Sequence, residues 1–169
     1  MANRLEVLRI EIDRLIMENQ EKEARYFISH LYGVSHFCTL LAFRRGQNAE
    51  LAAISGMLHD IYQITHSTLK KHAVKGAKVA KKILKAQGAY SDNEISLITT
   101  AISRHSDKES IHEPFDETLK DADVMSHSLY NPDFPVLEKE ILRYKNIMME
   151  LGCKSALHLI EGNSIGGNL

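Results

Sequence analysis

Histidine and aspartate stand side by side at positions 59 and 60, at the end of an apolar stretch that reads AELAAISGMLHDI. Imidazole nitrogens and carboxylate oxygens both bind transition-metal ions. An ionised carboxylate is rarely buried without a cation or strong hydrogen-bond partners. Packing alone therefore explains this pair poorly. Four more residues of these two types stand in similar helical contexts: His30, His72, His105 and Asp123. Together they predict a metal site inside the protein.

The residues around two of these histidines predict that the side chains point inward. His30 shares an apolar helical face with Val34 and Cys38, which follow it at intervals of one turn. Gly76 lies one turn after His72, and a small residue there lets the helix approach the site closely. Several helices are therefore expected to present metal-binding groups to a shared interior.

Helices are the elements that must position these groups, because apolar residues recur every three or four positions along most of the chain. No stretch shows the alternation of a half-buried strand, so the predicted fold class is all-α. Segments 62–69 and 107–113 are predicted as loops. The helices are expected at about 5–15, 23–45, 48–60, 70–87 and 91–105, and in two segments that begin near Pro114 and Pro135.

Capping signals support several of these boundaries. Asn48 is suited to cap the helix that leads to His59. Ser91 and Glu94 have the S-x-x-E spacing of a capping box. Proline is favoured in the first turn of a helix, as expected at Pro114 and Pro135.

The composition is that of one globular domain. The chain has 169 residues, of which 44% are hydrophobic and 25% charged, and a net charge of −1 gives no general attraction to nucleic acid or anionic membrane. We expect a single helical bundle over residues 1–161, with its core at 23–130 and a flexible tail at 162–169. The first helix is expected to cover the core, and homo-oligomerisation stays open.

The expected location is the cytoplasm. Two cysteines outside any CxxC pair are too few for a disulfide framework, which favours a reducing compartment. The N-terminal residues are charged every few positions, unlike a signal peptide. The longest stretch without acidic or basic residues, 27–43, contains histidines, serines and a threonine, so no membrane span is expected.

The order His, then His-Asp, then a distant Asp resembles the HD superfamily of metal-dependent phosphohydrolases. The resemblance covers about residues 30–123 and rests on HLYGVSHFCTLLA, AAISGMLHDI, HAVKGAKVAKKIL, AISRHS and KDADVMS. It implies an HD-type helical bundle in which Asp60 is the catalytic carboxylate and bridges two ions. The implied metal ligands are His30, His59, Asp60, His72, His105 and Asp123. In a single-metal site, His72 and His105 would instead form a polar pocket wall.

The chemistry implied by the resemblance is hydrolysis of a small phosphoester, with a nucleotide as the favoured substrate, by a metal-bound hydroxide. Two cations about 3.5–4 Å apart polarise a phosphoryl oxygen and acidify a shared water. Nitrogen and oxygen ligands suit one or two divalent ions, namely Mn, Fe, Ni, Zn or Mg. Two alternatives remain: a dinuclear iron oxygenase on the same fold, and a non-catalytic nucleotide-binding or signalling module.

Substrate contacts are expected from Gln63, Lys75 and Arg104. Family members often carry Gly-Lys or an acid shortly after His-Asp, whereas Gln63 can bind a phosphate but cannot donate a proton as a general acid. Lys75 belongs to a basic stripe at helical spacing, which is either a solvated face or a guide for a phosphorylated substrate. The stripe comprises Lys71, Lys75, Lys78, Lys82 and Lys85.

Three further histidines are assigned lesser roles. His127, one turn beyond Asp123, is expected at the surface or in hydrogen bonding to a ligand. His66 competes with His72 as the nearby ligand, and His72 is favoured because Gly76 follows it. His36 is expected on a different helical face from His30.

Overall fold

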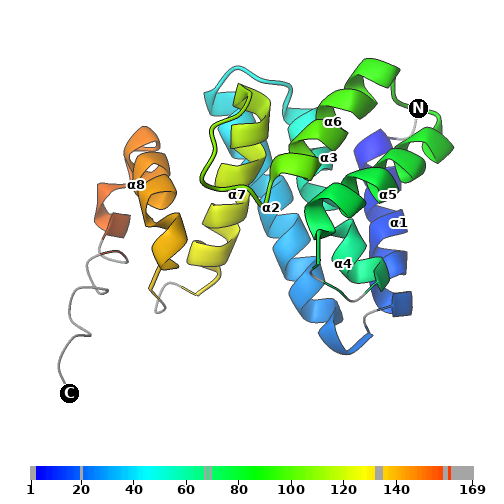
Figure 1. The fold of residues 1–169 in the computed structure, drawn as a ribbon, viewed down its shortest axis with the longest axis horizontal. Coiled ribbons are helices and arrows are strands. Elements are labelled where there is room, and N and C mark those ends of the chain that lie inside the picture. Colours follow the sequence, from blue (N-terminus) through cyan, green and yellow to red (C-terminus); the bar gives the residue numbers. More distant parts are fainter. Residues whose placement is uncertain are drawn as a thin grey trace.

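The computed structural model is all-α, as the periodicity predicted, and it describes residues 3–19, 21–66, 68, 70–131, 135–157 and 160 (Figure 1). These residues contain no strand. Short 3-10 turns occupy Glu21–Glu23, Glu138–Glu140 and Lys154–Leu157. The helices are α1 (Arg4–Asn19), α2 (Ala24–Arg44), α3 (Ala49–Leu58), α4 (Ile61–His66), α5 (His72–Gln87), α6 (Asp92–Arg104), α7 (Pro114–Tyr130) and α8 (Ile141–Glu150).

Helix α2 is the central element of the bundle. It packs against α3 on one side and α7 on the other, while α5 packs against α6 and α1 covers α3 and α4 (Figure 1). The core between them includes Leu31, Ile54, Leu58, Ile102 and Leu119, all buried. Helix α8 contacts α7, at the opposite side of the molecule from α1 (Figure 1).

The backbones of α2 and α3 approach each other unusually closely at Gly56. A Cβ atom at this position would lie 2.7 Å from the Ser35 Cα and 2.8 Å from the Ser35 nitrogen. The Ser35 hydroxyl also donates to the Ala53 carbonyl across the same interface at 3.0 Å. Only glycine permits this approach, which sets α3 and the His-Asp pair at its end against α2.

The predicted helix-start signals at Asn48, Ser91 and Pro114 are confirmed. The Asn48 side chain accepts a hydrogen bond from the Leu51 amide at 3.0 Å. Ser91 and Glu94 form a complete capping box at the start of α6. Pro114 begins α7, where its missing N–H leaves no hydrogen bond unmade.

Two predictions of secondary structure are wrong: the loop at 62–69 and the helix start at Pro135. Segment 62–69 was expected as a loop, but α4 forms there because Ile61 and Ile64 are both buried against the bundle. Pro135 was expected to start a helix, but the chain continues without regular structure to the turn at Glu138–Glu140, and α8 begins only at Ile141. Val136 is anchored in the core there, 2% exposed, which holds this stretch against the bundle.

No helix in the described part of the chain is long and apolar enough to cross a membrane. The predicted tail at 162–169 lies outside the described residues. The domain limits at 1–161 remain a prediction.

Candidate metal centre

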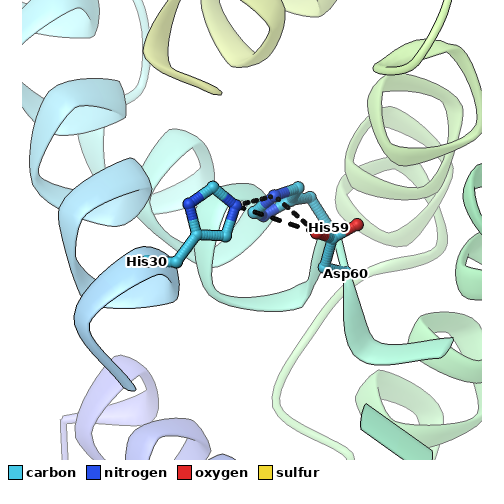
Figure 2. A group of neighbouring side chains, drawn as sticks. All are labelled: His30, His59 and Asp60. Atoms are coloured by element: carbon cyan, nitrogen blue, oxygen red, sulfur yellow. Dashed lines mark hydrogen bonds and ion pairs between the residues drawn. The ribbon is translucent and has the colours of Figure 1, made fainter. Parts of the chain in front are cut away.

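The six predicted ligands come from five separate parts of the chain and meet at one largely buried site. Asp60 and His59 lie in the break between α3 and α4, where the chain turns before α4 begins. His30 reaches them from the second turn of α2, and Figure 2 shows its ring directed at His59 and Asp60. The other three lie on or beside other helices: His72 is the first residue of α5, His105 follows the last residue of α6, and Asp123 lies within α7.

The Asp60 carboxylate lies between two pairs of histidines. Its Oδ2 is 3.7 Å from His30 Nε2 and 3.5 Å from His59 Nε2. Its Oδ1 is 3.5 Å from both His72 Nε2 and His105 Nε2. Each oxygen therefore faces its own pair of imidazole nitrogens, and each pair together with Asp60 forms a group that could hold a metal ion.

The histidine pairs present their ring nitrogens to each other. His30 Nε2 lies 3.1 Å from His59 Nε2, and His72 Nε2 lies 3.1 Å from His105 Nε2. Two unprotonated nitrogens at this distance repel each other, because each directs a lone pair at the other. A cation or a proton between them satisfies both.

Backbone carbonyls assign the tautomer of one histidine in each pair. His59 Nδ1 donates to the Gly56 carbonyl and His105 Nδ1 to the Ile102 carbonyl, both at 2.8 Å. A carbonyl can only accept, so the hydrogen of the neutral ring is on Nδ1. The Nε2 lone pair then points into the centre, as in histidines that bind metals.

The second carboxylate, Asp123, closes the centre from α7. Its Oδ1 is 3.5 Å from His30 Nε2 and 3.6 Å from His59 Nε2. Both this oxygen and Asp60 Oδ1 are buried and have no hydrogen-bond donor among the described residues. Buried oxygens of this kind are costly without a positive partner. The donor set therefore fits divalent cations.

The charge states also suit a cation. Burial raises the pKa of Asp60 and Asp123, but His59 and, for Asp123, Lys108 outweigh it and hold both pKa values well below the usual range. Burial lowers the pKa of His30 to about 4 and also lowers that of His105. The carboxylates are thus ionised and these imidazoles neutral, as metal ligation requires.

Comparison with protein families agrees with this geometry. The family described as HD domain matches residues 27–161, most of the chain. The chain belongs to the HD domain family. Its superfamily is one of metal-dependent phosphohydrolases, so the resemblance seen in the sequence is confirmed. Comparisons with curated proteins and with solved structures give no match.

We predict that metal uptake by this HD domain releases protons. Burial lowers the pKa of His59, but the Asp60 and Asp123 carboxylates outweigh it and raise that pKa to about 9. Below that pH the metal-free protein therefore holds a proton that a cation must displace, so affinity falls as the pH falls. Calorimetric titration with Mn²⁺ near neutral pH, in buffers of different ionisation enthalpy, should show release of about one proton. Heats that do not depend on the buffer would contradict this.

Sequence reasoning missed Lys108. It lies in the stretch predicted as a polar loop, yet it is 9% exposed and its Nζ lies 2.6 Å from Asp123 Oδ2. Lysine in a polar stretch is usually solvated, and no spacing marks this one. Ser126 was also missed: its hydroxyl lies 3.1 Å from His30 Nδ1. Its position three residues after Asp123, on the same helical face, was an available signal.

We expect that Lys108→Ala lowers metal-dependent activity about 10–100-fold, the range for partners that orient a metal ligand. Without Lys108, the Asp123 Oδ2 is buried with no cation and the carboxylate can rotate. Steady-state kinetics on the metal-loaded variant measures this. Lys145→Ala, at an exposed position on α8, is the matched control. Activity within twofold of the parent for Lys108→Ala would contradict the role of this contact.

Of the three histidines with lesser predicted roles, His127 lies nearest the centre. His127 Nε2 is 3.4 Å from Asp123 Oδ1, and its ring stacks on His30 with centroids 5.1 Å apart. Its side chain is 34% exposed, at the edge of the centre. His66 stacks on Tyr62 and His36 is exposed on α2; neither belongs to the cluster of potential metal ligands.

The three predicted substrate contacts occupy different surroundings. Gln63 is in the first turn of α4, where its backbone N–H donates to the Asp60 backbone carbonyl at 2.9 Å. Lys75 Nζ lies 3.1 Å from the Tyr62 hydroxyl. Arg104 forms an ion pair with Asp116 at 2.7 Å. Their contact with substrate stays a prediction, and most of the basic stripe on α5 is exposed.

Proposed function

We propose that this HD domain is a divalent-metal-dependent phosphohydrolase that acts on a small phosphoester, with a nucleotide as the favoured class. One observation carries the proposal: the two oxygens of Asp60 face two separate pairs of histidine Nε2 atoms. This geometry supports two adjacent cation positions, and the family supports phosphoester hydrolysis.

The residues that would hold the cations divide into two sets that share Asp60. By their distances to the carboxylate oxygens, His30, His59 and Asp123 belong to one set, and His72 and His105 to the other. Bound divalent ions would polarise the phosphoryl group and lower the pKa of a bound water, which supplies the nucleophile. Lys108 contacts Asp123 Oδ2. This contact keeps the other oxygen, Oδ1, directed at the His30 imidazole.

A protein nucleophile has little support. Cys38 is fully buried in the core, and burial raises the pKa of its thiol well above the usual range, so it is neither accessible nor ionised. Cys38 is therefore excluded as the attacking group, and the proposal uses water activated at the Asp60 cluster.

The test uses the protein stripped with a chelator and then reloaded with Mn²⁺, Fe²⁺, Ni²⁺, Zn²⁺ or Mg²⁺ in turn. Phosphate release is measured on a panel of nucleotides and other phosphomonoesters and diesters. We expect release that requires the metal and is lost again on chelation. Metal-loaded protein that binds nucleotides but releases no phosphate would contradict the proposal and favour a binding module.

A further inference from the structure

A cavity of about 270 Å³ opens directly beside the metal centre. His30 and His127 form the wall that it shares with the centre. The end of α7 and the segment before α8 also line the cavity, with Tyr130, Val136 and Leu137. A group attached to a phosphate at the Asp60 cluster can therefore extend into this cavity.

Flat rings form the wall nearest the centre. Tyr26 and His30 are stacked with centroids 5.8 Å apart and planes 7° apart. His30 and His127 are stacked at 5.1 Å and 3°. The three rings thus lie nearly parallel, and such a surface favours contact with planar or apolar groups.

The described residues that line the cavity provide no lysine or arginine to receive a second phosphate. None of its described lining residues is Lys, Arg, Asp or Glu. A polyphosphate chain placed there would lose its hydration, which is costly. The His127 imidazole at the cavity edge could offset this, but it already faces the carboxylates of Asp123 and Glu140. Apart from the imidazoles, the polar side-chain groups of these lining residues are uncharged hydroxyls, carried by Tyr26, Tyr130, Ser126 and Ser128. The Ser126 hydroxyl already contacts His30 Nδ1. The lining therefore suits an uncharged group with few polar atoms.

We propose that this cavity binds the organic part of the substrate, and that the substrate is a phosphomonoester of an uncharged, flat and largely apolar group. The inference rests on the proposed function, because the metal centre must hold the phosphate. It narrows that function by excluding polyphosphate chains from the cavity.

Binding of two phosphonates tests the inference without requiring hydrolysis. Benzylphosphonate and methylphosphonate carry the same anionic group and differ by one phenyl ring. On the Mn²⁺-loaded protein, we expect benzylphosphonate to bind at least about tenfold more tightly, because the ring is buried against apolar walls. Equal dissociation constants for the two phosphonates would overturn the inference.

A pair of variants locates the effect. Leu137 is 52% exposed in the cavity wall, so Leu137→Asp can add a charge there without disturbing the core. It should reduce the ratio of the two dissociation constants several-fold. Leu142→Asp, at a 72% exposed position on α8 outside the cavity, should leave the ratio as it is. If the ratio of the dissociation constants is unchanged in Leu137→Asp, the phenyl ring does not bind in this cavity.

The two proposals fail in different ways. If benzylphosphonate binds about tenfold more tightly than methylphosphonate but no phosphomonoester is hydrolysed with any metal, the proposed function is contradicted and the binding cavity is supported. If phosphomonoesters are hydrolysed but the phenyl ring adds no affinity, the inference about the cavity is contradicted and the proposed phosphohydrolase activity is supported.

Discussion

Asp60→Asn should reduce metal-dependent phosphate release at least about a thousandfold, which corresponds to about 4 kcal/mol of lost transition-state stabilisation. The substitution keeps the shape of the side chain but removes the negative charge shared by both histidine pairs. Both cation positions lose their common ligand, so the metal content should fall as well. Initial rates and metal content of the same protein sample measure the two effects together.

The matched control for this variant is Asp92→Asn, at an exposed position in the first turn of α6. It makes the same chemical change away from the centre and should keep near-parental activity. If Asp60→Asn, correctly folded by circular dichroism, retained more than about a tenth of the parental rate, Asp60 could not be the bridging ligand.

Gly56→Ala should destabilise the protein by about 3 kcal/mol or prevent folding, since overpacking that backbone cannot relieve is among the costlier core changes. The new Cβ would meet the Ser35 Cα at 2.7 Å and the Val34 carbonyl carbon at 3.0 Å. These are backbone atoms, so α2 and α3 must separate. His59 should move with them, because its Nδ1 donates to the Gly56 carbonyl.

Gly76→Ala provides the comparison. Here the closest atom to the new Cβ is the His59 carbonyl oxygen at 3.3 Å, a smaller overlap. Replacing glycine by alanine within a helix gains about 1 kcal/mol, which offsets part of the crowding. We expect the free energy of unfolding to change by less than about 1 kcal/mol. Urea denaturation of both variants measures the difference, and similar losses for the two would contradict the close approach at Gly56.

Local signals made most helix boundaries predictable. Asn48, Ser91 and Pro114 act within one turn of the chain, so the residues themselves indicate where a helix begins. Helix α4 and the segment after Pro135 depend instead on burial against distant parts of the bundle. A six-residue helix shows too little periodicity to be recognised, and a proline that favours a helix start does not force one.

The candidate site was predictable where helical spacing placed a residue on an apolar face. That holds for His30 on α2 and Asp123 on α7. Lys108 was not predictable, because its burial depends on how the loop before α7 is held. Lys120 Nζ donates to the Ser110 carbonyl at 2.8 Å, and Arg143 donates to the Lys108 carbonyl at 3.1 Å. These hydrogen bonds join residues 10 and 35 positions apart in the sequence, so no local sequence pattern predicts them.

The metal content of the purified protein tests the metal centre most directly. Elemental mass spectrometry, with protein quantified by amino-acid analysis, should find about two transition-metal ions per chain after reconstitution. Two ions of Mn, Ni or Zn would match the proposed phosphohydrolase, whereas two irons without phosphate release would point to oxygen chemistry. One ion or fewer, with every metal tried, would contradict Asp60 as a bridge and reduce His72 and His105 to the wall of a single-metal pocket.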